Sequence, residues 1–255
     1  MKPDKRLGQH FLRDIEALEE IAAVAAVEET AGVLEIGPGE GALTGFLLRA
    51  GKPVVVIDKD ARSIAAIERR FGDRVQAVQG DALDADLRAL LPTGDRLPVV
   101  VGNLPYNVGT AIVRRLLGLT GRVSRLVVML QREVANRLVA QPGTKAYGLM
   151  TVLVWLSGEA WIVRDVPPES FSPPPKVSSG VVLIELRATP RLDAEELRDF
   201  TRFVGELFQA RRKMLRKTEI SAELLTEMGL QPTARPENLT PDQILALYRR
   251  GATVK

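Results

Sequence analysis

The stretch Val33-Leu34-Glu35-Ile36-Gly37-Pro38-Gly39-Glu40-Gly41 decides the fold. Its first four residues form a mostly apolar run, of the kind that is buried in a parallel sheet, and the run stops at a glycine-rich turn. Helical spacing of apolar residues begins at Leu43, so the stretch indicates a strand, a tight turn and a helix. Glycines let the backbone turn sharply and approach a ligand closely, and we expect a cofactor at this turn.

The alternation of strand and helix continues along the chain. Short runs of Val, Leu and Ile predict strands at residues 33–36, 54–57, 75–79, 99–101, 126–130 and 181–186. Apolar residues at helical spacing predict helices at residues 12–28, 43–49, 61–71, 110–117 and 133–139. This order predicts a doubly wound, Rossmann-like α/β sheet with a ligand site at the carboxyl ends of its strands. Residues 147–156 are apolar on every side, and we expect a helix there.

The C-terminal part of the chain has a different character. Asp193 with Glu196 three residues later is typical of a helix start, and Thr240 begins a second such pattern. No strand pattern accompanies them. We therefore predict an α/β domain of residues 1–188, which includes an N-terminal cofactor-binding arm, and a small all-α domain of residues 189–255.

Composition excludes several classes of chemistry. The chain of 255 residues contains no cysteine, which rules out disulfides, thiolate nucleophiles and methylation of a pyrimidine carbon through a cysteine adduct. It contains a single histidine, His10, so a His-containing zinc site or a Ser-His-Asp triad would rest on that residue alone. We expect no metal site.

The apolar runs are too short for a membrane protein. None approaches the roughly 18 residues that cross a bilayer, and the first residues lack the apolar segment of a signal peptide. With 45% hydrophobic and 26% charged residues, the chain has enough apolar material for a full core. The sequence predicts a cytoplasmic protein with no membrane partner.

Basic residues gather in two places although the net charge is only +3. One group lies near the N-terminus and comprises Lys2, Lys5, Arg6 and Arg13. The other falls within seven residues and comprises Arg211, Arg212, Lys213, Arg216 and Lys217. Such clusters attract polyanions, including nucleic acids, but a charge run is also the ordinary solvated face of a helix. Charge alone leaves both interpretations open.

The strand ends favour an adenosyl ligand without phosphates. The glycine turn does not have the G-x-G-x-x-G spacing of dinucleotide sites, and it lacks the Lys-Ser/Thr of a phosphate-binding loop. Asp58 ends the second strand, where a carboxylate can accept hydrogen bonds from ribose hydroxyls, while Asp60 suits the cap of the next helix. Asp81, in Gly80-Asp81-Ala82 after the third strand, could accept a bond from an adenine amino group. S-adenosylmethionine fits these features best.

The tetrapeptide Asn103-Leu104-Pro105-Tyr106 suits methylation of an amino group on a planar base. The exocyclic nitrogen of adenine is a poor nucleophile, and a side-chain amide oxygen together with a backbone carbonyl can hold both of its hydrogens. Pro105 fixes its own φ and restricts Leu104, which orients that carbonyl, and Tyr106 offers a face for a base. Taken alone, the tetrapeptide is equally typical of a turn after a buried strand.

Together these motifs resemble the small-subunit ribosomal RNA adenine dimethyltransferases, the KsgA family. The resemblance covers essentially the whole chain. It rests on Gly8-Gln9-His10-Phe11-Leu12, Leu34-Glu35-Ile36-Gly37-Pro38-Gly39, Gly80-Asp81-Ala82, Asn103-Leu104-Pro105-Tyr106-Asn107 and residues 171–177. Each motif alone is weak, but five in the family's order are specific.

The resemblance implies a set of site residues. S-adenosylmethionine would contact or lie beside Gln9, His10, Leu12, Gly37, Gly39, Asp58, Asp81, Ala82 and Asn103. Phe171 would cover the face of the target base opposite Tyr106. Many relatives carry Asn in place of His10 and Glu in place of Asp58, so for His10 a side-chain role and a purely backbone role both stay open.

The resemblance also implies a substrate. Methyl groups would pass to the amino nitrogens of two adjacent adenosines in the 3′-terminal hairpin of 16S rRNA, giving N6-dimethyladenosines during biogenesis of the 30S subunit. The RNA would be held through phosphate contacts from the N-terminal arm and from Arg211, Arg212, Lys213, Arg216 and Lys217. We expect a monomer.

Three alternatives remain at this point. A macrolide-resistance methylase of 23S rRNA would share the cofactor motifs and the proline loop. A non-catalytic ribosome-assembly or transcription factor could use the same fold to bind RNA, although intact Asn103, Tyr106, Asp58 and Asp81 argue against it. A DNA adenine methylase fits less well, because related sites carry Asp-Pro-Pro-Tyr where this chain has Asn103.

Overall fold

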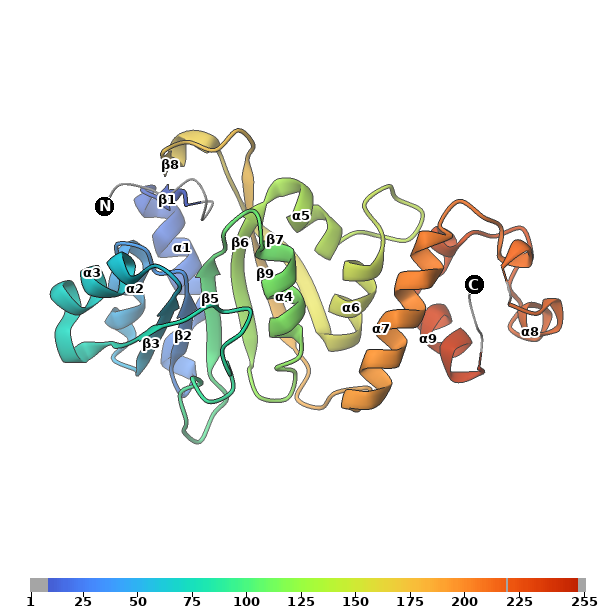
Figure 1. Cartoon of the computed structure of the whole chain (residues 1–255), viewed down its shortest axis with the longest axis horizontal. Helices are drawn as coiled ribbons and strands as arrows, with labels where there is room; N and C mark the ends of the chain where they lie inside the picture. Colours follow the sequence, from blue (N-terminus) through green and yellow to red (C-terminus); the bar gives the residue numbers. More distant parts are fainter. Residues whose placement is uncertain (1–8, 219, 252–255) are drawn as a thin grey trace. The chain divides into compact units, whose positions relative to one another are not determined.

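The computed structural model describes residues 9–218 and 220–251. The chain forms two compact units (Figure 1). The sheet unit comprises residues 1–135 and 158–189, and the helical unit comprises residues 136–157 and 190–255. Lys2, Lys5 and Arg6 of the basic N-terminal group, and Gly8 of the N-terminal motif, lie outside the described residues.

The two units differ from the predicted domains in one segment. Residues 136–157, which were assigned to the α/β domain of residues 1–188, group with the C-terminal helices instead. The division into functional domains at residue 188 stays a prediction.

A mixed sheet forms the centre of the sheet unit. In the described part of the chain its strand order is β4-β3-β2-β5-β6-β9-β7. The strands are β2 (Val33–Ile36), β3 (Val54–Asp58), β4 (Gln76–Gln79), β5 (Val99–Asn103), β6 (Arg125–Gln131), β7 (Gly158–Val166) and β9 (Ser179–Leu186). Strands β4 to β6 are parallel, and β9 runs antiparallel between β6 and β7. The doubly wound sheet and all six predicted strands are confirmed.

Strand β7 was not predicted from the sequence. It lies at the edge of the sheet and mixes charged and apolar residues, and it follows a helix with no intervening turn. Gly158 makes this junction possible, since a Cβ there would lie 1.9 Å from the carbonyl oxygen of Glu185. Helix α6 (Leu149–Ser157) is therefore followed directly by a strand whose sequence shows no periodic pattern of apolar residues.

Helices cover both faces of the sheet. On one face, α1 (Ile15–Ala25), α2 (Ala42–Leu47) and α3 (Ala61–Phe71) pack on alternate strand residues, including Val33, Val56 and Val101. The helix α4 (Gly109–Leu117) lies on the opposite face, and α5 (Arg132–Leu138) follows β6 (Figure 1). All five predicted helices are confirmed, with shifts of a few residues at their ends.

The largest such shift is at the N-terminus. The helix predicted from residue 12 begins only at Ile15, because Phe11 and Leu12 form β1, which pairs antiparallel with β8 (Phe171–Ser172). This pairing ties the N-terminal motif to the proline-rich loop. Short 3₁₀ turns complete the chain at η2 (Val27–Glu29), η3 (Leu48–Ala50), η4 (Gly72–Arg74), η5 (Pro168–Ser170), η6 (Leu215–Lys217) and η7 (Pro236–Asn238).

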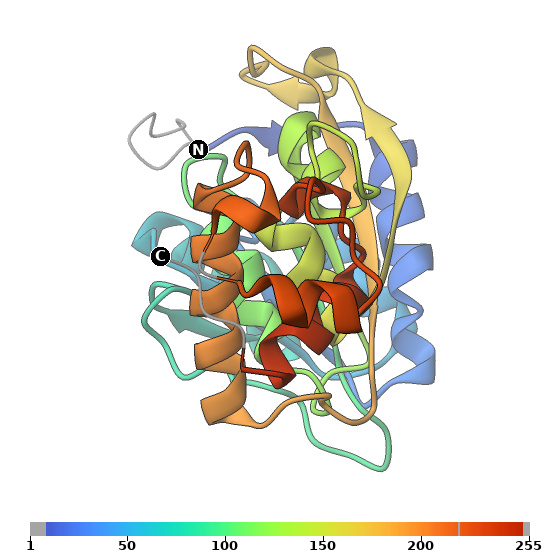
Figure 2. The same cartoon turned by 90° about the vertical axis from the view of Figure 1, so that its right-hand side faces the viewer.

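The helical unit has its own apolar core. Its helices are α6 (Leu149–Ser157), α7 (Ala194–Gln209), α8 (Ala222–Glu227) and α9 (Pro241–Arg249), and the last three appear in orange and red in Figure 2. Buried Val152, Phe200, Leu207 and Ile244 contribute to one cluster. The helix expected at residues 147–156 is confirmed as α6, and its apolar surface is explained in part by this cluster.

The predicted helix starts of the tail are also confirmed. Asp193 caps α7 and Thr240 caps α9, each with the reciprocal hydrogen bond of a capping box. Among the described residues, no helix has the length and apolarity needed to span a membrane. The same residues contain no group of three or more His, Asp or Glu side chains placed to hold a metal ion.

Candidate functional site

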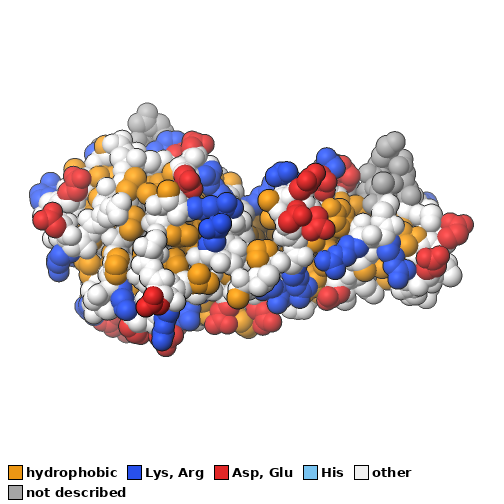
Figure 3. All heavy atoms as spheres, turned by 90° about the horizontal axis from the view of Figure 1, so that it is seen from below, with side chains coloured by type: hydrophobic (Ala, Val, Ile, Leu, Met, Phe, Trp, Pro, Cys, Tyr) orange, Lys and Arg blue, Asp and Glu red, His pale blue; other side chains and the backbone are white. Residues whose placement is uncertain are grey.

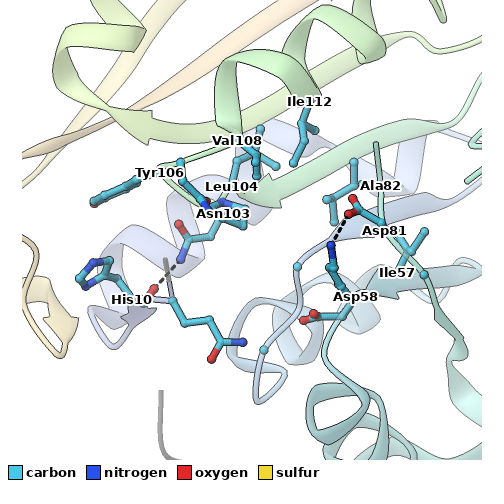
Figure 4. A pocket seen from close by; sticks show the side chains of 18 of the residues that line it. His10, Ile57, Asp58, Asp81, Ala82, Asn103, Leu104, Tyr106, Val108 and Ile112 are labelled. Atoms are coloured by element: carbon cyan, nitrogen blue, oxygen red, sulfur yellow. Dashed lines mark hydrogen bonds and ion pairs between the residues drawn. The ribbon is translucent and has the colours of Figure 1, made fainter. Parts of the chain in front are cut away.

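A cavity of about 200 Å³ opens at the carboxyl ends of β2 to β5 (Figure 4). This is the point where the strand order reverses between β2 and β5, the usual position of a ligand in an open α/β sheet. Most of the predicted cofactor and catalytic residues line it: Gln9, His10, Gly37, Gly39, Asp58, Asp81, Ala82, Asn103, Leu104, Pro105 and Tyr106. The sheet thus brings together residues that are up to 97 positions apart, from Gln9 to Tyr106.

The glycine turn forms one wall of the cavity. Gly37, Gly39 and Gly41 have φ values of 70°, 56° and 78°, a region that side chains disfavour. A Cβ on Gly39 would lie 2.9 Å from the ring of Phe11, so the turn and the N-terminal arm pack closely. Residues with a side chain would strain the backbone at these three positions, and at Gly39 the side chain would also clash with Phe11.

Asp58 and Asp60 have the separate positions that the sequence predicted. Asp58 ends β3 and lines the cavity, and burial raises the pKa of its carboxyl above the ordinary value. Asp60 caps α3 by accepting a hydrogen bond from the backbone N–H of Arg62. Gln9 donates to the other carboxylate oxygen of Asp60 over 3.0 Å, which joins the N-terminal arm to this corner.

Asp81 faces the cavity with both carboxylate oxygens already engaged. One accepts from the backbone N–H of Leu83 at 2.9 Å, and the other accepts from Lys59 Nζ at 2.8 Å (Figure 4). The Lys59 ammonium is the main reason that the pKa of Asp81 lies below its ordinary value. Ala82 lies beside it and is buried. Lys59 also lines the cavity and was missed in the sequence, where a lysine after a strand carries no specific signal.

Glu35 is a buried carboxyl directly beneath the glycine turn. Its side chain accepts a hydrogen bond from the Thr44 hydroxyl at 2.6 Å and is 2% exposed. Burial raises the pKa of Glu35 to about 7. The sequence placed Glu35 within the turn motif but gave it no role, because its burial depends on α2 packing against the strand.

The side chain of Asn103 is oriented by the N-terminal arm. Its Nδ2 donates to the backbone carbonyl oxygen of His10 at 2.9 Å. A carbonyl oxygen can only accept, so the NH₂ end of the amide must face His10 and Oδ1 must face away from it (Figure 4). Within the described residues Oδ1 accepts no hydrogen bond, which leaves a fixed acceptor at the cavity.

The Leu104 backbone is fixed on both sides. Its side chain is 1% exposed, and its N–H donates to the carbonyl oxygen of Met129 at 3.1 Å. Pro105 follows, with its φ restricted by the ring. In the described part of the chain, the Leu104 carbonyl oxygen has no hydrogen-bond donor. It is a second available acceptor next to Asn103.

Tyr106 is fixed at its hydroxyl and covered on one face. The hydroxyl shares a 2.5 Å hydrogen bond with the buried hydroxyl of Ser179, and burial raises the pKa of Tyr106. The ring of His10 stacks on Tyr106 with centroids 5.2 Å apart and planes inclined by 28°. His10 Nδ1 lies 2.8 Å from the carbonyl oxygen of Pro173, to which it must donate. Both the backbone and the side chain of His10 therefore contact the site.

Two predicted residues do not line this cavity. Leu12 is 5% exposed and lines a second cavity of about 110 Å³ on the other side of the glycine turn, which also includes Glu35 and shares Phe11, Gly37, Gly39 and Asn103. Phe171 is 4% exposed and packs in the core of the sheet unit. In this conformation Phe171 presents no face to the cavity, and its predicted stacking on a base stays a prediction.

The basic cluster of the helical unit contains two kinds of residue. Arg211 is held within the unit: its Nε binds Glu237 Oε2 at 2.5 Å, and its two terminal nitrogens donate to the carbonyl oxygens of Lys145 and Thr144 at 2.8 and 2.9 Å. By contrast, Arg212, Lys213, Arg216 and Lys217 are exposed and form no ion pair among the described residues. Arg211 thus resembles a structural clamp, while its neighbours are available to a partner.

An open hollow of the helical unit collects further positive charge. Lys145, Arg212, Lys213 and Arg235 line it together with Arg211 and its partner Glu237. Lys145 and Arg235 are exposed and were not singled out in the sequence, since each stands apart from other basic residues. Figure 3 shows basic and acidic side chains interspersed over one face of the molecule.

The cavity of the sheet unit fits S-adenosylmethionine. Carboxylates from β3 and the loop after β4 line the cavity as hydrogen-bond acceptors of the kind that ribose hydroxyls and an adenine amino group require, and glycines with positive φ allow close backbone approach. Ile57, Ala82 and Ile112 supply apolar wall.

The sequence of the whole chain is similar to those of known proteins. A family model described as ribosomal RNA adenine dimethylase matches residues 1–252. Proteins named ribosomal RNA small subunit methyltransferase A from Brucella abortus and Ruegeria pomeroyi are each 41% identical to this chain, covering 97% of it and 92% of their own length.

Solved structures show the same fold. The 23S rRNA methyltransferase ErmE superposes with a TM-score of 0.71 and 27% identity, covering 94% of this chain and 98% of its own. A dimethyladenosine transferase from Plasmodium falciparum superposes with a TM-score of 0.79 and 24% identity, covering 96% of this chain and 100% of its own.

Proposed function

Because this chain belongs to the ribosomal RNA adenine dimethylase family and is therefore a methyltransferase that uses S-adenosylmethionine, we propose that it dimethylates two adjacent adenosines of 16S rRNA. The adenosines are those of the 3′-terminal hairpin, and the product is N6-dimethyladenosine in the 30S subunit or its precursor. The observation that carries the proposal is the pair of free acceptors, Asn103 Oδ1 and the Leu104 carbonyl oxygen, beside a site suited to the cofactor.

The cofactor would be held by residues of the strand ends. Asp58 would accept from the ribose hydroxyls and Asp81 from the adenine amino group, with Gly37 and Gly39 along the remainder. Gln9, His10, Leu12 and Ala82 would complete its surroundings. When bound, S-adenosylmethionine supplies an activated methyl group. The protein must then align a nucleophile and supply fixed dipoles, and a strong general base is not required.

The catalytic groups act on the amino nitrogen of the target. Asn103 Oδ1 and the Leu104 carbonyl accept its two hydrogens, which draws the lone pair out of conjugation with the ring. Pro105 keeps that carbonyl in place, and Tyr106 supplies the stacking surface. After attack, the nitrogen loses its extra proton to solvent. Phe171 is proposed to cover the other face of the base, which requires that its loop move away from the core.

The exposed basic residues would hold the RNA. Arg212 and Lys213 line the hollow with Lys145 and Arg235, and Arg216 and Lys217 lie exposed on η6. Their contacts to phosphates position the RNA without reading its sequence. Arg211 would act mainly by holding the loop of residues 144–145 in place.

A second candidate function is methylation of 23S rRNA, and it rests on the similarity to ErmE. The higher identity to small-subunit methyltransferases favours 16S rRNA. We also propose that the protein acts in the cytoplasm and as a monomer.

Labelled methyl transfer to purified particles tests the function. Undermethylated 30S and 50S particles are offered separately with labelled S-adenosylmethionine, and the product nucleosides are identified by mass. We expect two N6-dimethyladenosines per 30S particle. Label confined to 50S particles supports the second candidate, and absence of label from both would leave only a non-catalytic role.

A further inference from the structure

The stack of His10 on Tyr106 occupies the face that a target base needs. If Tyr106 is the stacking surface for adenine, as the proposed function has it, the base must lie against the part of the ring that borders the cavity. His10 and Tyr106 both line that cavity. Their centroids are 5.2 Å apart, and stacked aromatic rings are themselves about 4.5 to 7 Å apart, so no third ring fits between them.

The two rings are held very differently. Tyr106 is fixed through its hydroxyl, which is bonded to Ser179, a residue that is 0% exposed. His10 is partly exposed, and among the described residues its ring forms one hydrogen bond, from Nδ1 to the carbonyl oxygen of Pro173. The Tyr106 ring is therefore held in place, whereas the His10 ring that covers it can move away without disturbing the core.

The backbone of His10 can stay while its ring moves. The bond from Asn103 Nδ2 is to the His10 carbonyl oxygen, not to the imidazole. Rotation about the Cα–Cβ bond therefore uncovers Tyr106 and keeps the catalytic amide oriented. A single residue thus serves Asn103 through its backbone and Tyr106 through its side chain.

We infer that the imidazole of His10 is an exchangeable cover of Tyr106, which occupies the place of the target adenine until the base displaces it. This inference rests on the proposed function, because it takes Tyr106 as the base-stacking residue. The cover shields an aromatic face in the free enzyme and competes with the base for it. His10 is accordingly a positioning residue that sets the affinity for substrate.

Substitutions with graded expected effects test the inference. His10→Asn removes the ring but keeps a donor for Pro173, and His10→Phe keeps an aromatic ring but loses the donor. With undermethylated 30S particles, we expect His10→Asn and His10→Ala to lower KM for the particle by about three- to tenfold, the worth of one stack and one hydrogen bond. We expect His10→Phe, which keeps the stack and loses only the hydrogen bond, to lower that KM less than His10→Asn does.

General damage to the arm would not give this pattern. Damage would raise KM or lower kcat in every variant, whereas the cover predicts a lower KM in each, with the smallest change in His10→Phe. An unchanged or raised KM in His10→Asn overturns the inference. The wild-type protein is assayed first. If it failed to methylate 30S particles, the proposed function would be refuted, and this outcome is distinct from a refuted inference.

A spectroscopic measurement examines the stack directly. Because the chain has a single histidine, imidazole NMR signals report on His10 alone. In the wild-type protein we expect these signals to be displaced by the ring current of Tyr106, and in Tyr106→Leu we expect that displacement to vanish. Equal imidazole shifts in the two proteins would show that the rings are not stacked, and would overturn the inference even if the kinetic variants failed to fold.

Discussion

Asn103 donates its side-chain amide hydrogen to the backbone carbonyl oxygen of His10 across 2.9 Å, although the two residues are 93 positions apart. This bond decides which end of the amide points at the cavity. The oxygen that would grip the target amino group is therefore oriented before any substrate arrives, and catalysis gains from such preorganised dipoles. In the proposed mechanism, the N-terminal arm would thus orient the catalytic amide as well as line the cofactor cavity.

Replacing Asn103 should abolish most of the activity. In Asn103→Ala one of the two acceptors is lost, and we expect kcat to fall about 100-fold or more, as for other preorganised groups. Asn103→Asp keeps an oxygen but cannot donate to the His10 carbonyl, and we expect it to be similarly impaired. Asn107→Ala is the matched control, since Asn107 lines the same cavity but forms no hydrogen bond within the described residues. Turnover is measured at saturating cofactor, and near-normal kcat in Asn103→Ala would refute the assignment.

The ring of Tyr106 should matter more than its hydroxyl. Tyr106→Phe loses the bond to Ser179 but keeps the stacking surface, and we expect KM for 30S particles to change by less than about threefold. Tyr106→Ala loses the surface, and KM should rise by at least about tenfold, because base stacking on an aromatic ring is worth about 1–3 kcal/mol. If the two variants behaved alike, the role of the ring would have to be abandoned.

Asp81 should govern cofactor affinity, and Lys59 should not. Removing the charge in Asp81→Asn weakens a charge-assisted hydrogen bond, so binding of S-adenosylhomocysteine should weaken by about tenfold or more. Lys59 pairs with Asp81 from a side chain that is 65% exposed, and exposed pairs contribute little. We therefore expect Lys59→Met to change affinity by less than about threefold. Isothermal titration calorimetry measures both affinities. A larger loss of affinity in Lys59→Met would show that Lys59 itself contributes to cofactor binding.

Burial of Glu35 should make stability fall as pH rises. Its pKa in the folded protein, about 7, exceeds the ordinary value of 4.5, so the fold favours the protonated form. The stabilisation is complete below about pH 4.5 and is lost as pH rises to 7. Glu35→Gln lacks this titrating group. Between pH 4.5 and pH 7, its free energy of unfolding should therefore rise by about 3 kcal/mol relative to that of the wild-type protein. Urea unfolding across the range measures this, and parallel pH profiles would exclude the shift.

The basic cluster should separate into structural and RNA-binding residues. Arg211→Gln breaks bonds within the helical unit, and we expect it to lower the free energy of unfolding by about 2 kcal/mol. Charge reversal of Arg212 and Lys213 should leave stability nearly unchanged. It should reduce the slope of log affinity against log salt by about 0.7–0.9 for each lost phosphate contact. Binding of 30S particles at several salt concentrations is the measurement, and an unchanged slope would remove these residues from the interface.

Much of the fold could be predicted because its signals are local. The apolar run at residues 33–36, the caps Asp193 and Thr240, and the helix of residues 61–71 each depend on neighbours in sequence, and all are confirmed. Strand β7 could not be found this way, since an edge strand has no buried periodicity and Gly158 joins it directly to a helix.

The site was predictable to the extent that strand ends converge. Parallel strands bring Asp58, Asp81 and Asn103 to one edge, so their meeting follows from the topology. The burial of Phe171 and the internal bonds of Arg211 depend on long-range packing and could not be read from spacing. The same is true of the stack between His10 and Tyr106.

The central claim is that Asn103 Oδ1 and the Leu104 carbonyl grip one amino group. A crystal structure of the enzyme with S-adenosylhomocysteine and an RNA containing the target adenosine measures this directly. We predict that the adenine amino nitrogen lies about 2.7–3.2 Å from both oxygens, with the base on Tyr106. An amino nitrogen directed away from either oxygen, in an otherwise ordered complex, would contradict the account.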